Sequence, residues 1–240
     1  VSDQTCAEIP QLYGPGSFDT STALVLVNAI FAEADWDTPF DPNLTQPRPF
    51  TRADGSVVNP ETMSVWTSLP VHETGDLTVA RIPVQGGELG FWVVLPDAPD
   101  GLADVEDTWT PALLDSWTAQ AQHRFVELWM PNHTITVDHD LKPVLQGLGV
   151  QDLFDVTSAD LSGMTTDPND LFAAGVVQDA TITFDEEGLR AAAATGVTVI
   201  NDTAATPEPL HLDRPHLWVL RDELTGLVLF MGRTTDPTAP

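Results

Sequence analysis

The sequence of 240 residues contains one cysteine and one lysine, and it has no long apolar run. Cys6 can form neither an internal disulfide nor a thiolate metal cluster, so we interpret it as a small buried or tolerated residue and not as a nucleophile. No apolar run reaches the roughly 18 residues of a transmembrane helix, which excludes that element. No basic segment followed by an apolar one opens the chain, so targeting does not predict a compartment.

Positive charge is also scarce. The chain has 9 basic residues against 36 acidic ones, for a net charge of -27. Phosphates would be repelled, which argues against a nucleic-acid partner, and anionic membrane surfaces are disfavoured for the same reason. One hypothesis is adaptation to high salt, where screening removes self-repulsion, and a melting temperature that does not rise in molar salt would contradict it. An acidic protein from a GC-rich genome is the equal alternative.

Short apolar segments bounded by turns are frequent. The apolar run over 22–31, interrupted by Asn28, predicts a strand buried on both faces. Segments 77–83 and 89–95 flank Gln85–Gly87 and predict a hairpin. Further strands are expected over 124–130, 134–137, 171–184, 217–220 and 227–230, with short helices over 110–121 and 140–153. The sequence therefore predicts one α+β domain over 1–240, with several sheets and few helices.

The segment after Phe184 has a different composition. Ala191–Ala194 favour a helix, whereas Val197–Ile200 favour a strand. Small side chains suit a segment that is exposed in one state and enters a sheet in another. As a strand, it would place Leu189 on an uncharged face that can bury, and Arg190 on the opposite face. The simpler interpretation is a long surface loop, and loops of this length are uncommon unless they are functional.

At these residues the chain resembles the serpin family. Glu186–Gly196 is similar to the family's hinge. Leu24–Phe31, with Trp36 and Pro39–Phe40, is similar to the third strand of its main sheet. Three further segments match the family: Asp140–Phe154, Ala159–Met164 and Arg214–Arg233. The resemblance spans essentially the whole chain in the right order but begins partway through the family fold. It implies the C-terminal two-thirds of a serpin, a fragment without the N-terminal helices and early strands.

The resemblance implies an inhibitor of a serine or cysteine protease that acts as a suicide substrate, and not an enzyme. It places a reactive-centre loop over 186–210. The implied hinge residues are Glu186, Glu187, Gly188, Leu189, Ala191, Ala192, Ala193, Ala194 and Thr195. The implied bait bond joins Asp202 and Thr203, with Asn201, Ala204 and Ala205 as alternatives. Asp202 would suit a protease that accepts acidic residues, and the alanines would suit an elastase-like or subtilisin-like one.

Three positions depart from the family's pattern. Leu189 stands where serpins usually have a small hydroxyl residue. Gln178 stands where many members have a histidine that pairs with the asparagine matching Asn28, and a Gln–Asn hydrogen bond could replace it. Asn132 stands where some members have a lysine, so Glu186 is expected to lack that partner.

The resemblance also implies a region where the main sheet opens, formed by Asn28, Trp36 and Gln178. It further implies a target protease as partner, a monomer when full length, no cofactor, and an extracellular or cell-surface location. A metal site is not expected, because His133 and His139 would share a strand face only at its ends. A non-inhibitory serpin that acts as a binding or chaperone-like module is the alternative function.

Overall fold

The computed structural model describes residues 24–30, 33–164, 171–189 and 206–239. The chain divides into two compact units, residues 1–32 with 135–182 and residues 33–134 with 183–240, and each is described by itself. Strands dominate both units, and the three α-helices of the described residues are short. The expected α+β class with several sheets and few helices is therefore confirmed.

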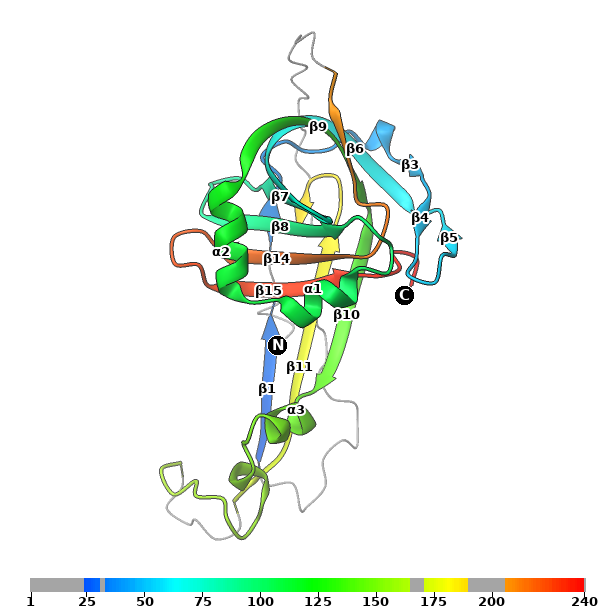
Figure 1. Cartoon of the computed structure of the whole chain (residues 1–240). Coiled ribbons are helices and arrows are strands. Elements are labelled where there is room, and N and C mark those ends of the chain that lie inside the picture. Colours follow the sequence, from blue (N-terminus) through cyan, green and yellow to red (C-terminus); the bar gives the residue numbers. More distant parts are fainter. Residues whose placement is uncertain (1–23, 31–32, 165–170, 190–205, 240) are drawn as a thin grey trace. The chain divides into compact units, whose positions relative to one another are not determined.

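The first unit contains β1 (Leu24–Ile30), most of β10 (His133–Asp140) and most of β11 (Ala173–Phe184), with α3 (Lys142–Gly147) and η3 (Asp152–Phe154). β1 runs parallel to β11 and is hydrogen-bonded to it, and β10 also pairs with β11 (Figure 1). Phe154, Ala173 and Val176 form a small core. The expected burial of the first strand on both faces is wrong within this unit, because Val27 is 51% exposed.

β10 and β11 also present two aspartates to each other. The Thr136 and Thr181 hydroxyls are 3.4 Å apart across the two strands. Asp138 lies two residues after Thr136, and Asp179 lies two residues before Thr181. Burial, and then the charge of Asp138, raise the pKa of Asp179. Like charges opposite each other destabilise a strand pair, so this contact weakens the pairing at neutral pH.

The second unit contains an eight-stranded sheet with the order β13-β9-β6-β7-β8-β14-β15, and β3 pairs with β6. Its strands are β3 (Gln46–Pro47), β6 (Glu61–Thr74), β7 (Leu77–Pro83), β8 (Leu89–Pro96), β9 (Gln122–Pro131), β13 (Glu208–His211), β14 (His216–Asp222) and β15 (Val228–Thr234). Other elements of this unit are β2 (Ala34–Asp35), β4 (Phe50–Thr51), β5 (Val57–Val58), β12 (Gly188–Leu189), η2 (Pro42–Leu44), α1 (Leu102–Thr108) and α2 (Pro111–Gln120). The hairpin expected at Gln85–Gly87 joins β7 to β8, and Gly86 and Gly87 have positive φ.

One face of this sheet packs against the two helices. Trp92, Val94 and Val219 on the strands belong to one buried cluster with Leu114 and Trp117 of α2. The Thr110 hydroxyl accepts a hydrogen bond from Leu113 N and caps the start of α2, whose first residue is proline. This cap and the apolar spacing explain why the segment forms a helix where the sequence predicts one.

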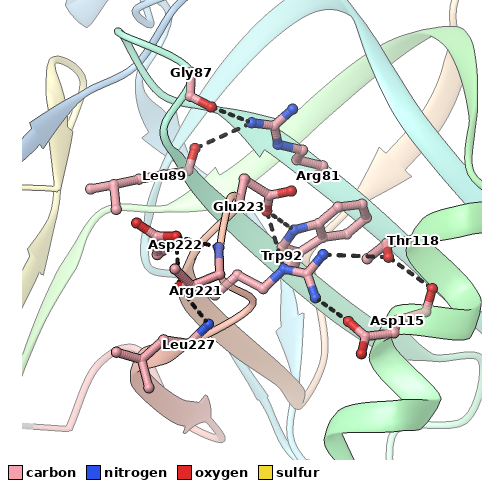
Figure 2. Close-up of polar contacts among 11 residues, drawn as sticks. Arg81, Gly87, Leu89, Trp92, Asp115, Thr118, Arg221, Asp222, Glu223 and Leu227 are labelled. Carbon is pink, nitrogen blue, oxygen red and sulfur yellow. Dashed lines mark hydrogen bonds and ion pairs between the residues drawn. The ribbon is translucent and has the colours of Figure 1, made fainter.

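A buried arginine links this helix to the sheet (Figure 2). Arg221 of β14 forms ion pairs with Asp115 of α2, at 2.8 Å, and with Glu223, at 3.2 Å. Its guanidinium lies 5.6 Å from the Trp92 ring, and Trp92 Nε1 donates to Glu223 Oε1 at 2.7 Å. The charge on Arg221 is thus balanced by two carboxylates, which burial of a guanidinium requires.

Candidate functional site

The chain reverses direction sharply after β11. The Asp185 carboxylate accepts hydrogen bonds from the backbone nitrogens of Glu187 and Gly188, at 2.9 and 3.0 Å. The chain then returns as β12, in which Leu189 pairs with Phe184 in antiparallel register. A Cβ atom at Gly188 would clash with the backbone of Ala34, so only glycine fits. The start of the segment expected to be the hinge is therefore a strand, antiparallel to β11.

β12 lies between two strands. Its second partner is β2, where Leu189 pairs with Ala34, and the Leu189 side chain is 0% exposed. The uncharged face expected for the hinge is thus buried at its first residue. Leu189 is apolar, so this burial carries no desolvation penalty of the kind that a charged residue would bring.

The residues after β2 hold the backbone of the turn. The carbonyl of Glu187 accepts from Trp36 N and that of Glu186 accepts from Phe40 N, each at 2.8 Å. Trp36 Nε1 donates to the carbonyl of Asp185, also at 2.8 Å. Three consecutive carbonyls, those of residues 185–187, are therefore held by one short segment.

The Glu186 side chain is held as well. Thr45 Oγ1 donates to Glu186 Oε1 at 2.6 Å, and Asn132 Nδ2 donates to Glu186 Oε2 at 2.9 Å. We call these three residues the Glu186 clasp. Glu186 lacks the lysine partner, as expected, but Asn132 takes that place as a hydrogen-bond donor to the carboxylate.

Removal of the clasp is expected to destabilise the second unit. The double variant Thr45→Val with Asn132→Leu keeps similar side-chain volumes but leaves the Glu186 carboxylate without both donors. Hydrogen bonds to charged groups contribute roughly 1.5–3 kcal/mol each, and Glu186 can partly recover by hydrating, so we expect a loss of about 2 kcal/mol in urea unfolding. The exposed Thr206→Val is the control, and equal unfolding midpoints for the two proteins would contradict the role of the clasp.

An aromatic cluster lies beneath the turn. Trp36 is 0% exposed, and its ring centroid is 5.6 Å from that of Phe91, which lies 5.4 Å from Phe184. His133 packs on Phe184 with a centroid distance of 5.1 Å. Phe184, the residue that ends β11, is therefore buried against both Phe91 and His133.

Two histidines in this region are kept neutral. Burial lowers the pKa of His216 to about 4. The hydrogen bond with the Arg214 carbonyl opposes this shift, and the charges of His133 and Arg214 add to it. Burial also lowers the pKa of His133. Because both folded-state pKa values lie below the ordinary value, protonation as pH falls below about 6.5 favours unfolding. At neutral pH the two histidines therefore act as packed, uncharged groups.

The structure brings together part of the expected site. Glu186, Glu187, Gly188 and Leu189 lie against the segment of Trp36, and Asn28 lies directly opposite Gln178 in the β1–β11 register. Residues 191–195 and the expected bond between Asp202 and Thr203 lie outside the described residues. Sequence reasoning missed Thr45, for which no local pattern gave a signal. It also missed Asp185, whose spacing to Gly188 could have indicated the turn.

Among the described residues, no group of three or more histidine, cysteine, aspartate or glutamate side chains is placed to hold a metal ion. In the same part of the chain, no helix has the length and apolar character needed to cross a membrane. His133 instead contacts the Pro131 carbonyl through Nδ1 and the Thr234 hydroxyl through Nε2, both at 3.1 Å.

The described fold combines a large sheet with a strand, β11, that turns back into β12 and is held there by β2 and the residues after it. The model of the serpin (serine protease inhibitor) family matches residues 1–237, and the chain belongs to the serpin family. It is 31% identical to rat neuroserpin and 34% identical to mouse leukocyte elastase inhibitor A, over 99% of this chain in both cases. The crystal structure of native protease nexin-1 with heparin matches 98% of the chain with a TM-score of 0.87 and 28% identity.

The chain spans only part of these relatives. It covers 59% of rat neuroserpin, 64% of mouse leukocyte elastase inhibitor A and 64% of the protease nexin-1 chain. The family is that of an inhibitor and not of an enzyme, whereas the activity, target and mechanism of the whole protein are matters for proposal.

Proposed function

We propose that the full-length protein is a monomeric inhibitor of a serine or cysteine protease and acts as a suicide substrate. The observation that carries the proposal is the state of Leu189, which is buried and paired on both sides as the last residue of β12, a strand antiparallel to β11. In this state the loop is joined to a sheet at its start and can extend the strand once it is cut.

Strand direction favours this extension. β1 and β11 are parallel and directly hydrogen-bonded, with Asn28 opposite Gln178. A strand that continued from β12 between them would be antiparallel to both. Insertion would replace one parallel ladder by two antiparallel ones, and antiparallel pairing is the more stable per residue. The extra ladder therefore favours insertion of the cut loop. We assign Asn28, Gln178 and Trp36 to the region where the sheet opens.

The protease supplies the catalytic groups of the reaction. Its serine oxygen or cysteine sulfur attacks the carbonyl carbon of Asp202, and the bond to the Thr203 nitrogen breaks. The new amine leaves with a proton, and the acyl group stays on the protease as an ester or thioester. Insertion of 189–202 before water hydrolyses that bond would hold the protease in the acyl form. Asn201, Ala204 or Ala205 would shift the bond without changing this sequence of events.

A protease panel tests the proposal. The full-length protein would be incubated with proteases that prefer acidic residues and with elastase-like and subtilisin-like ones. We expect an SDS-stable covalent complex with at least one, and a released peptide that begins at Thr203. Cleavage of the loop with no complex for any protease would contradict inhibition and favour the binding or chaperone-like alternative.

A further inference from the structure

Two histidines lie beside the strand end that turns back into β12. His216 is the first residue of β14 and is 3% exposed. His133 is the first residue of β10 and is half-buried. Histidine is the side chain whose charge changes most readily between about pH 5 and pH 8. These two imidazoles can therefore respond to pH, provided that their surroundings distinguish the neutral form from the charged one.

One threonine connects the two histidines. His216 is directly opposite Thr234 in the register of β14 and β15, and the Thr234 hydroxyl lies 3.1 Å from His133 Nε2. Thr234 is itself 2% exposed. We call His133, Thr234 and His216 the histidine group. It joins the start of β10, the start of β14 and the end of β15.

The hydrogen bonds determine which nitrogen of each ring carries the proton at neutral pH. A carbonyl oxygen can only accept. His216 Nδ1 therefore donates to the Arg214 carbonyl at 2.8 Å, and His133 Nδ1 donates to the Pro131 carbonyl at 3.1 Å. His133 Nε2 is then the nitrogen without a proton, and it accepts from the Thr234 hydroxyl. A second proton on His133 would point a donor at that hydroxyl and force it to turn away.

The carboxylates closest to the histidine group in the sequence are paired with arginines. They are Asp213, which pairs with Arg214, and Asp236, which pairs with an arginine at position 52. The other charges that act on His216 are positive, since they are Arg214 and, once protonated, His133. In the described part of the chain, no carboxylate affects the pKa of either histidine. A protonated ring therefore has no counter-ion, and burial of an unpaired charge is costly.

The histidine group is connected to β12 through Phe184. The His133 and Phe184 rings pack with their centroids 5.1 Å apart, and Phe184 is paired with Leu189 of β12. The two carboxylates that follow Phe184 are engaged elsewhere, because Asp185 accepts from the backbone of the turn and Glu186 belongs to the clasp. A charged His133 gains hydration by leaving the Phe184 ring. The strand end that pairs with β12 then loses one side of its packing.

We propose that the histidine group is a pH switch, which keeps β12 in the sheet at neutral pH and releases it in acid. Protonation of either ring places an unbalanced charge in a packed region, and opening around Phe184 brings that charge to water. The consequence for inhibition rests on the proposed function. A released β12 delays insertion of the cut loop, so trapping of the protease fails in acid and returns at neutral pH.

Hydrogen exchange of the full-length protein tests the switch without a protease. The pKa of His216 is about 4 in the closed structure and about 6.5 in water. Lowering the pH from about 7.5 to about 5 therefore raises the population of an open form that exposes His216 by roughly thirtyfold. We expect the protection factors of residues 184–189 to fall at least about tenfold, and those of β7 and β8 to stay unchanged. Unchanged protection of residues 184–189 would overturn the switch.

The double variant His133→Gln with His216→Phe removes both titratable rings. Glutamine can still accept from Thr234, and phenylalanine keeps the volume of the ring, so protection in acid should stay at its neutral level. The matched control is His123→Gln, because His123 is exposed on β9, and it should respond to acid as the natural protein does. His216→Phe alone should lose most of the response and serves if the double variant does not fold. A full acid response in these variants would assign the opening to other groups.

A cysteine protease that is active at both pH values separates the switch from the proposed function. If it is trapped, the yield of covalent complex should fall about tenfold in acid for the natural protein and stay constant for the double variant. A protein that shows the exchange response but forms no complex at either pH refutes inhibition and leaves the switch in place. Equal yields at both pH values, together with unchanged exchange, would refute the switch and leave inhibition in place.

Discussion

Leu189→Asp is expected to convert the protein from an inhibitor of its target protease into a substrate that the protease cleaves and releases. The side chain at this position is fully buried between β2 and β11. Burial of an unpaired carboxylate costs several kcal/mol, more than a two-residue strand returns, so β12 should leave the sheet. Without its first pair, the cut loop inserts late and the protease completes hydrolysis. We expect the yield of covalent complex per cleaved inhibitor to fall at least about tenfold.

The control for this variant is Leu189→Thr, which brings the small hydroxyl residue that serpins usually have at this position. It should retain most of the complex yield because threonine is favourable in strands. A second readout needs no target protease. The thermal midpoint should rise after loop cleavage in the natural protein and in Leu189→Thr, but not in Leu189→Asp. Equal trapping by Leu189→Asp would show that the β12 pairing has no part in inhibition.

Trp36→Ala is expected to have the largest effect on stability. Trp36 is 0% exposed, contacts Phe40 and Phe91, and donates to the Asp185 carbonyl. Replacing a buried tryptophan by alanine typically costs 3–5 kcal/mol, so we expect a loss of about 4 kcal/mol in urea unfolding. The same change releases Asp185, so the turn before the hinge should become sensitive to proteases.

Two other variants separate the causes of this loss. Trp36→Phe keeps an aromatic ring and removes the hydrogen bond to Asp185, so it should cost about 1–2 kcal/mol. Trp66→Ala removes the same side chain from an exposed position and should change stability by less than about 0.5 kcal/mol. Similar unfolding midpoints for Trp36→Ala and Trp66→Ala would contradict the anchoring role of Trp36.

Local patterns in the sequence predict much of the fold. The apolar runs and Gln85–Gly87 give β7, β8 and their turn, and Pro111 with the spacing of Leu114 and Trp117 gives α2. The helix expected over 140–153 is shorter in the structure, because α3 ends at Gly147 and a separate 3-10 turn follows. A pattern of apolar residues shows what can form a helix, but not where the chain leaves it.

Other elements have no clear local signal. α1 has two buried residues, Leu102 and Val105, which are too few for a helical period to emerge. β13 carries Pro209, which argues against a strand, yet it pairs with β9 in parallel at the end of the sheet, where a missing N–H is tolerated. The sequence alone therefore does not show that a segment with proline is an edge strand, because its place in the sheet depends on the tertiary fold.

The candidate site also combines residues that the sequence indicates with residues that it does not. Small residues and alternation mark the hinge in the sequence, and the buried Leu189 agrees with the expected uncharged face. The contacts that hold the hinge come from residues far away in the sequence, since Thr45 and Glu186 are 141 positions apart. Such pairs leave no local pattern, and they depend on how β6 and β9 position Asn132 next to Glu186.

The Glu186 clasp has a consequence for ionic strength. Its two donors, a hydroxyl and an amide, carry no net charge. A lysine in place of Asn132 would form an ion pair, and counterions weaken exposed ion pairs as their concentration rises. Added salt weakens short hydrogen bonds from neutral donors much less than it weakens ion pairs. The hold on the hinge is therefore nearly independent of dissolved salt, even though the repulsion among the many acidic side chains of this protein changes strongly with it.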